Sequence, residues 1–182
     1  VPYILVALRR TVPLADFARA AMPVQVLAFS TQSSLACLPA MLERAQDDLR
    51  IPPRVSGLVL PLAVAVFRLT SPVANLAVCY FIAHIYGIQP GLPQMLAAVA
   101  VAFAISVGSV GLPGEISFFA SVAPICIALG LPIDLLPILL AVEVVPDIFR
   151  TIGNVTGDLG VTAALHRPGD EVEIADPASA PA

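Results

Sequence analysis

Apolar runs follow one another along the whole chain, and short stretches of polar, glycine or proline residues interrupt them. Such runs predict helices, but most are shorter than the roughly 20 apolar residues that a helix needs to cross a bilayer. The predicted pieces cover residues 14–31, 33–48, 55–66, 73–87, 93–107 and 114–129, and a longer last helix is predicted over 133–165. We expect residues 1–8 to be the end of a further membrane helix.

The short apolar pieces are joined in the order hairpin, broken helix, hairpin. Polar residues at 30–34 join the first two pieces, and the sequence GSVGLPGE at 108–115 joins the last two, which predicts two hairpins. Residues 67–72 place Arg68 and Pro72 inside a hydrophobic run, which predicts a broken helix. Irregular backbone is tolerated at membrane depth only where it is buried in protein or lines a water-filled cavity, and secondary transporters build their sites from such helices.

The pattern therefore predicts an all-α membrane protein with two re-entrant helical hairpins, one broken transmembrane helix and one long transmembrane helix with a polar stripe. The predicted parts are 1–10 (the end of a transmembrane helix), 11–53 (first re-entrant hairpin), 54–90 (unwound transmembrane helix), 91–131 (second re-entrant hairpin), 132–166 (last transmembrane helix) and 167–182 (acidic tail).

Composition supports lipid as the solvent. Hydrophobic residues make up 58% of the 182 residues and charged residues 12%, with a mean hydropathy of +0.92, whereas soluble domains carry about 25% charged residues. The alternative is a soluble bundle of short helices punctuated by the 18 prolines, but its surface would lack charge. The nine basic residues are all arginines and are scattered, so we exclude nucleic-acid binding.

The formal net charge of −4 belongs to the end of the chain. Residues 167–182 contain four acidic residues and one arginine, so residues 1–166 carry nine acids against eight arginines. We expect residues 167–182 to be a disordered, solvated tail.

Catalytic and metal chemistry is not indicated by the sequence. Cys37, Cys79 and Cys126 lie far apart in apolar surroundings, without a CxxC pair. We expect them to be buried as small hydrophobic residues rather than to form a metal site or disulfides. The chain lacks the patterns typical of nucleophilic triads and phosphate-binding loops, so we predict that it is not an enzyme and needs no cofactor.

Five polar residues of the last predicted helix share one face. They are Glu143, Asp147, Arg150, Asn154 and Asp158, spaced four, three, four and four residues apart. An ionisable group within a membrane span costs about 2.5–3.5 kcal/mol on insertion scales, and such groups mark pathways or binding sites. The alternative is a ladder of ion pairs that only joins helices. Three acids and one arginine leave a charge of −2, which still needs a cation.

Several motifs resemble those of a known family. The sequences FSTQSS (29–34), LP (38–39), LPL (60–62), GLPG (111–114) and above all DIFRTIGNVTGDLGVTA (147–163) are similar to motifs of the dicarboxylate/amino acid:cation symporter family, the glutamate transporter homologues. The resemblance covers residues 1–166. It implies a fragment, the C-terminal transport core of a longer protein, in which residues 91–131 act as the gate.

For the whole protein the resemblance implies a homotrimer in the cell membrane. The transport core would slide through the lipid bilayer against a scaffold made by N-terminal spans that are missing here, which is an elevator-type mechanism. The compactness of the chain favours a bacterial inner membrane.

The resemblance also implies which residues bind the substrate. Arg150 would pair with a side-chain carboxylate through its planar fork, Asp147 would take the α-amino group, and Glu143 would orient Arg150. These roles suggest a symporter of acidic amino acids such as glutamate and aspartate. The alternatives are a C4-dicarboxylate:proton symporter, which has no ammonium for Asp147 to neutralise, and a relative that binds an anion without transporting it.

Further positions follow from the same resemblance. Asn154 and the backbone at Ser33 and Ser34 would hold the α-carboxylate, and Asp158 would bind sodium with the help of the Asn154 carbonyl. The remaining substrate-binding positions are Thr151 on the last helix and Gly111, Pro113 and Gly114 at the gate tip.

The seventh-helix motif departs from the family pattern. Where the family usually reads NMDGT, this chain reads FRLTS at 67–71, so the carboxylate of a buried sodium site is absent and Arg68 adds a positive charge. We interpret Arg68 as a substitute for a cation and expect reduced dependence on sodium. Glu115 stands after the gate tip, where small residues are usual, and coupling by one sodium ion or by a proton stays open.

Overall fold

Helices form the regular structure of this chain. The computed structural model describes residues 2–9, 11–68, 70–108 and 115–166, and these ranges contain no strand. In chain order the helices are α1 (Pro2–Arg9), α2 (Leu14–Thr31), α3 (Leu38–Asp47), α4 (Pro53–Val66), α5 (Thr70–Ile85), α6 (Leu92–Gly108), α7 (Glu115–Leu129), α8 (Leu136–Leu140) and α9 (Val144–Leu165). The predicted all-α architecture is confirmed for the described ranges.

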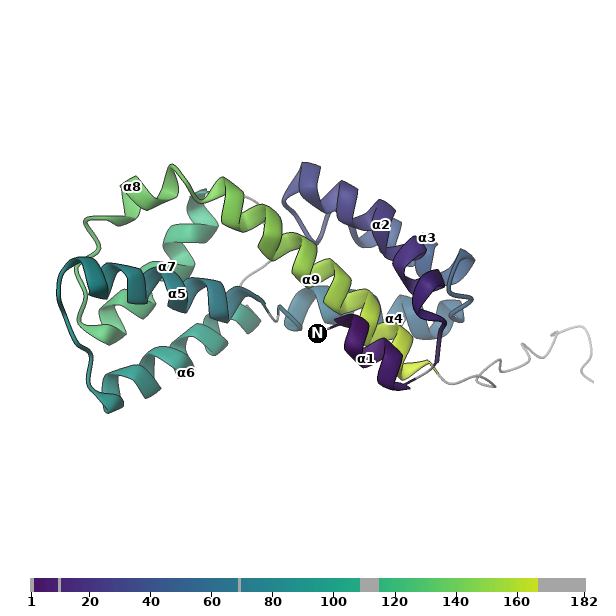
Figure 1. Ribbon diagram of the computed structural model, residues 1–182, viewed down its shortest axis with the longest axis horizontal. Coiled ribbons are helices and arrows are strands. Elements are labelled where there is room, and N and C mark those ends of the chain that lie inside the picture. The colour runs from purple at the N-terminus through teal and green to yellow at the C-terminus, as the bar shows by residue number, and fades with distance from the viewer. Residues whose placement is uncertain (1, 10, 69, 109–114, 167–182) are drawn as a thin grey trace, which may run out of the picture.

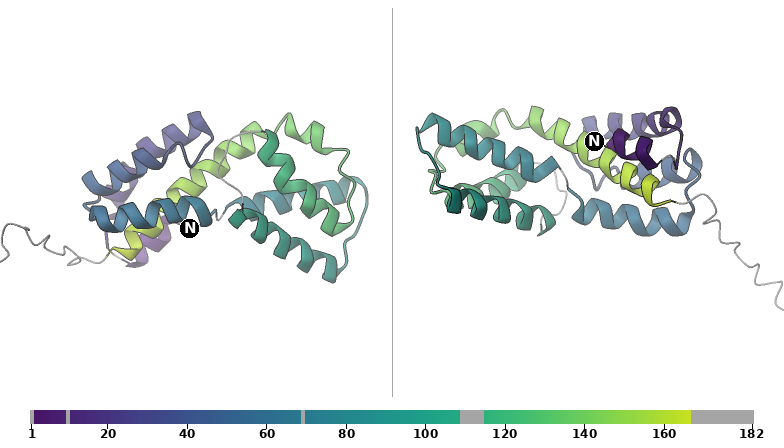
Figure 2. Two further views of the ribbon diagram at one scale, coloured as in Figure 1. Left: turned by 180° about the vertical axis from the view of Figure 1, so that it is seen from behind. Right: turned by 60° about the horizontal axis from the view of Figure 1, so that its bottom comes forward.

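Two hydrophobic clusters divide the helices into two halves (Figure 1). Helices α1 to α4 pack around the C-terminal part of α9 and bury Phe17, Met41 and Leu159 completely. Helices α5 to α8 form the second cluster, which buries Ile82 and Ile125. Figure 2 shows that α9 runs along the first half and that its N-terminal end reaches toward the second. Helix α9 therefore connects the two halves.

The first predicted hairpin consists of α2 and α3, and both helices contact α9. Helix α2 ends where Gln32 takes a left-handed conformation, with φ of 51°. The prediction started the second piece at residue 33, whereas α3 starts at Leu38, with Pro39 in its first turn. Proline has a fixed φ and lacks an N–H, and it is therefore favoured at a helix start. The turn at 32–37 is thus longer than predicted.

The predicted broken helix is present, but its interruption is shorter than the sequence suggested. Helix α4 ends at Val66 and α5 begins at Thr70, so Pro72 lies in the first turn of α5, where its missing N–H costs no hydrogen bond. Together the two helices form the stretch Pro53–Ile85. Within the described chain, this stretch is the one that is long and apolar enough to cross a membrane, judged by length and composition.

The second predicted hairpin corresponds to α6 and α7, which pack against each other. Both are apolar helices shorter than a full span. The tip residues Gly111, Pro113 and Gly114 lie outside the described residues, as does the predicted tail at 167–182. The re-entrant position of both hairpins in a bilayer stays a prediction.

The last helix begins later than predicted. Instead of one helix over 133–165, the short helix α8 ends at Leu140 and α9 starts at Val144. Pro146 explains the difference, because its ring would clash with the carbonyl four residues earlier in a continuous helix. The prediction of one uninterrupted helix was therefore wrong.

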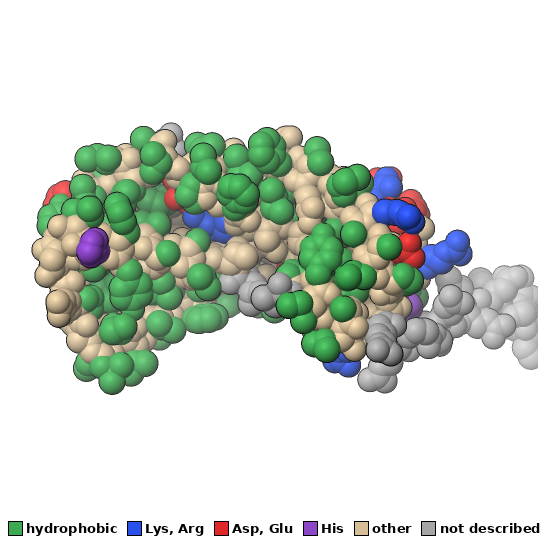
Figure 3. Space-filling view, viewed as in Figure 1, with side chains coloured by type: hydrophobic (Ala, Val, Ile, Leu, Met, Phe, Trp, Pro, Cys, Tyr) green, Lys and Arg blue, Asp and Glu red, His purple; other side chains and the backbone are tan. Residues whose placement is uncertain are grey.

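The surface of the described chain is largely apolar. Figure 3 shows hydrophobic side chains spread across the visible face, whereas most of the charged side chains in view gather at the end formed by the first half. Large apolar residues are widely exposed, among them Leu8, Val73, Ile127 and Phe149. A soluble bundle does not tolerate so much exposed apolar surface. This exposure favours lipid or further protein as the surroundings of the chain.

Candidate functional site

The predicted polar stripe lies on α9 and on the turn before it. Glu143 directly precedes α9, and the other four residues of the stripe belong to the helix. Glu143 and Arg150 are each 8% exposed, Asn154 is 2% exposed and Asp158 is 1% exposed. Buried charged and polar groups are costly unless they find partners, so the contacts of these residues indicate what the site can do.

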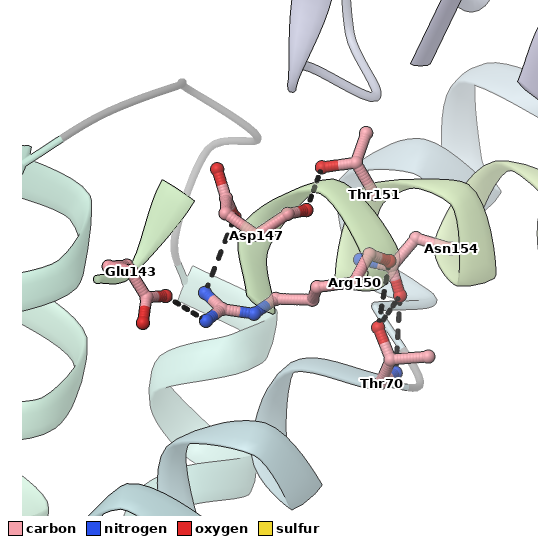
Figure 4. A network of polar contacts seen from close by, with 6 residues as sticks. All are labelled: Thr70, Glu143, Asp147, Arg150, Thr151 and Asn154. Atoms are coloured by element: carbon pink, nitrogen blue, oxygen red, sulfur yellow. Dashed lines mark hydrogen bonds and ion pairs between the residues drawn. The ribbon is translucent and has the colours of Figure 1, made fainter. Parts of the chain in front are cut away.

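Arg150 lies between two acids (Figure 4). Its Nη2 donates a hydrogen bond to Oε1 of Glu143, and its Nη1 lies 3.6 Å from Oδ1 of Asp147. The Asp147 N–H donates to the Glu143 carbonyl at 2.9 Å, which holds the turn beside the helix. Glu143 is a hydrogen-bonded partner, whereas Asp147 is beyond ordinary hydrogen-bond distance. The Asp147 ion pair is therefore the looser of the two.

The pairs of Arg150 with Glu143 and Asp147 form the ladder of ion pairs that was the alternative to a binding site. This ladder does not include Asp158. Asp158 lies two turns beyond Arg150, and its Oδ1 has no hydrogen-bond partner among the described residues. A nearly fully buried carboxyl group is costly as an isolated charge, so it either takes up a proton or is offset by a nearby positive charge. Asp158 therefore remains a candidate cation ligand.

Arg68 provides positive charge close to this stripe. It lies in the break between α4 and α5 and is half-buried. It is near enough to interact electrostatically with Asp147 and Asp158, and also with the like charge of Arg150. Arg68 is thus within electrostatic range of Asp158, the predicted cation ligand. Its role as a cation substitute stays a prediction.

Thr70 attaches the broken helix to α9 (Figure 4). Its backbone N–H donates to Oδ1 of Asn154 at 3.1 Å, and its hydroxyl lies 2.8 Å from the same oxygen and 3.0 Å from the Arg150 carbonyl. Gly153 permits this approach, because a Cβ at that position would lie 2.8 Å from Cγ2 of Thr70. The start of α5 is therefore held against the middle of the stripe.

The first hairpin also packs against α9, and its turn carries two buried serines. Ser33 and Ser34 lie in it and are 7% and 5% exposed. The Ser33 hydroxyl accepts the Ala36 N–H at 3.2 Å, which stabilises the turn. In Figure 4, Thr151 points from α9 toward the purple first hairpin, and its hydroxyl donates to the Asp147 carbonyl at 2.9 Å. The helices of the first hairpin and of the broken helix thus pack against α9, and the substrate-binding roles of Ser33, Ser34 and Thr151 stay predictions.

One contact residue was not predicted from the sequence. The sequence patterns did not indicate a function for Thr70. Gly153 and Gly157 lie four residues apart on α9, which is the spacing of small residues at which helices approach closely in membranes. That spacing was the available signal for a close neighbour at this face.

The three cysteines are buried, as predicted. Cys79 and Cys126, although distant in sequence, pack together with their Sγ atoms 3.5 Å apart. Within the described ranges, no three His, Cys, Asp or Glu side chains are grouped to hold a metal ion.

Comparisons with known proteins agree with the resemblance. The sodium:dicarboxylate symporter family matches residues 1–167. The chain is 32% identical to human Neutral amino acid transporter A over 139 residues, which are 76% of this chain and 26% of that protein. It is 28% identical to the Putative sodium-dependent excitatory amino acid transporter glt-4 of Caenorhabditis elegans over 92% of this chain and 33% of the relative. It is 29% identical to the Proton/sodium-glutamate symport protein of Geobacillus stearothermophilus over 73% of this chain and 31% of that protein.

The chain belongs to the sodium:dicarboxylate symporter family. The resemblance predicted from its motifs is confirmed, and a membrane location follows from the family. The chain spans about a quarter to a third of the length of these relatives. Both animal and bacterial proteins are among them, so the comparisons do not favour the bacterial inner membrane over other cell membranes.

The buried ion pair predicts a large effect on stability. Glu143→Ala removes the hydrogen-bonded partner of Arg150 and leaves its charge poorly compensated, so the full-length protein should lose about 3–5 kcal/mol of unfolding free energy. Denaturant unfolding in detergent micelles measures this loss. The matched control is Glu43→Ala, because Glu43 pairs with Arg44 at the surface and its side chain is 55% exposed. Equal effects of both variants would contradict a structural role for the buried pair.

Proposed function

We propose that this chain forms the transport core of a secondary active symporter for acidic amino acids such as glutamate and aspartate. The observation that carries the proposal is the buried Arg150, held between Glu143 and Asp147 in an apolar helical protein. The names of its relatives, which include a glutamate symport protein and an excitatory amino acid transporter, support the same substrate class.

The two ion pairs of Arg150 suggest how such a substrate binds. The looser pair, with Asp147, separates, while the hydrogen bond with Glu143 keeps the guanidinium in place. The substrate's side-chain carboxylate then pairs with Arg150, and its ammonium pairs with Asp147. One internal ion pair is thus replaced by two pairs with the substrate, so neither buried charge is left without a partner.

This exchange distinguishes substrate classes. A C4-dicarboxylate satisfies Arg150 but leaves Asp147 without its partner, whereas a neutral amino acid satisfies Asp147 but offers no carboxylate to Arg150. A buried charge that loses its partner is costly, so each of these should bind more weakly than an acidic amino acid. The relative named a neutral amino acid transporter makes this comparison necessary.

Arg68 supports reduced sodium dependence. The embedded residues Glu143, Asp147 and Asp158 carry three negative charges, and Arg150 and Arg68 carry two positive charges, which leaves −1. The family pattern, with its additional Asp and without this arginine, would give −3. A tethered guanidinium supplies charge without the entropy of recruiting an ion, so fewer mobile cations are needed.

In the full-length protein we infer an elevator-type mechanism within a homotrimer. The widely exposed apolar residues of this chain suit a core that lies against lipid and N-terminal scaffold helices. Uptake of radiolabelled aspartate, glutamate and succinate by proteoliposomes with the full-length protein tests the function. A non-transporting relative would show saturable binding without gradient-driven accumulation.

The first prediction concerns selectivity for the second carboxylate. Arg150→Thr removes a charge-assisted pair worth about 1.5–3 kcal/mol, so the affinity for aspartate and glutamate should fall at least about tenfold while small neutral amino acids gain. Competition uptake assays measure both changes. Arg54→Thr at the exposed end of the first half is the control. Unchanged affinity for acidic substrates in Arg150→Thr would refute the assignment.

The second prediction separates amino acids from dicarboxylates. Asp147→Asn removes the charge that neutralises an ammonium, so uptake of aspartate and glutamate should fall far more than uptake of succinate or malate. Parallel uptake measurements with the four substrates give the ratio. Equal losses for all four would mean that Asp147 is structural or that the natural substrate is a dicarboxylate.

The third prediction concerns the coupling ion. If Arg68 supplies charge in place of a cation, initial uptake should depend weakly or not at all on sodium, and Arg68→Met should increase that dependence. Uptake is measured with sodium varied from zero to saturation at fixed pH, and then with pH varied at zero sodium, which separates sodium from proton coupling. Steep, multi-ion sodium dependence of the wild type would overturn the idea.

A further inference from the structure

Thr70 fixes the orientation of a buried amide. The Oδ1 atom of Asn154 accepts hydrogen bonds from the N–H and the hydroxyl of Thr70, at 3.1 and 2.8 Å. Asn154 is 2% exposed, so water does not readily replace these contacts. A side-chain amide has one acceptor oxygen and one donor nitrogen. With Oδ1 turned to Thr70, the Nδ2 group of Asn154 must point away from it.

This orientation determines which charge Asn154 can bind. An anion needs the N–H donors of the amide, whereas an amide turned by half a rotation would present its oxygen and repel a carboxylate. The Thr70 N–H can only donate, so in the reversed orientation it would face the Nδ2 donor, which makes that orientation unfavourable. The hydroxyl, which also lies 3.0 Å from the Arg150 carbonyl, would at the same time give up its bond to Oδ1.

We propose that Thr70 is a positioning residue, which holds the amide of Asn154 so that Nδ2 donates to the α-carboxylate of the substrate. This inference rests on the proposed function, in which Asn154 binds that carboxylate. In this proposal Thr70 acts through its hydrogen bonds to Asn154, so its effect on the ligand requires the Asn154 side chain.

Gly153 is a structural requirement for this contact. A Cβ at position 153 would lie 2.8 Å from Cγ2 of Thr70, but 3.8 Å from its Cβ and 3.9 Å from its Oγ1. Of these three atoms, only the methyl group of Thr70 lies too close for a Cβ at position 153. Thr70→Ser removes this methyl group and keeps the hydroxyl, so it makes room for Gly153→Ala.

The test compares Gly153→Ala, Thr70→Ser and the double variant in the full-length protein, by aspartate binding and by uptake kinetics. Gly153→Ala should raise the Kd and the KM for aspartate about five- to tenfold, since it displaces a hydroxyl that orients a ligand-binding group. The maximal rate should stay within about twofold. Thr70→Ser alone should behave like the wild type, and the double variant should regain wild-type affinity.

A second series removes the hydroxyl directly. Thr70→Val should weaken aspartate binding about three- to tenfold, and it should add no further loss in an Asn154→Ala background, because residues that act through one another are not additive. Thr11→Val is the matched control, because the Thr11 hydroxyl also donates to the α9 backbone, at Ala163, 2.7 Å away. The Thr11→Val variant should bind aspartate with wild-type affinity.

The outcomes separate this inference from the proposed function. If the wild type accumulates aspartate but Gly153→Ala binds it normally, or if Thr70→Ser does not rescue Gly153→Ala, Thr70 has no positioning role and the proposed function stands. If the wild type neither binds nor accumulates acidic amino acids, the proposed function fails and this inference fails with it. Should Thr70→Val not be produced, the Gly153 series decides alone.

Discussion

A charged side chain buried in an apolar protein must have partners, and the requirement of Arg150 for partners organises this structure. Its two acids come from the turn before α9 and from the first turn of the helix. The interruption before Val144 matters here, because it places Glu143 and Asp147 at the N-terminal, positive end of the helix dipole, where negative charge is favoured. The interruption between α8 and α9, which Pro146 imposes, therefore stabilises the acids that neutralise Arg150.

Close packing places the broken helix against this centre. In a membrane there is little hydrophobic force between helices, so association depends on van der Waals contact and interhelical hydrogen bonds. Gly153 and Gly157 provide the contact surface, since Thr70 packs on the first and the Phe67 ring lies 4.0 Å from where a Cβ of the second would be. The Thr70 N–H adds a hydrogen bond to Asn154, and its hydroxyl lies within hydrogen-bond distance of Asn154 and of the Arg150 carbonyl. The interruption between α4 and α5 is thus positioned opposite the polar stripe.

Local patterns predicted the helices and the stripe, whereas contacts between distant segments could not be read from the sequence. The spacing of Arg150 and its neighbours follows from helix geometry alone. Hydropathy does not reveal the late start of α9, because residues 133–143 are as apolar as the helix itself. Pro146 is the local feature that indicates it. The contact of Thr70 with Asn154 joins residues 84 positions apart, and that of Cys79 with Cys126 spans 47. Only tertiary packing decides such pairs.

A fixed charge and a mobile ion are not equivalent for a transporter. Either one can offset the Asp158 carboxylate, but only a mobile ion crosses the membrane down its own gradient. One charge moved through 100 mV is worth about 2.3 kcal/mol, so each sodium ion replaced by a tethered guanidinium removes that driving force from the cycle. The same replacement spares the site the entropy of recruiting an ion. On the proposed assignment, Arg68 therefore lowers the substrate gradient that the transporter can sustain, and it makes substrate binding less dependent on external sodium.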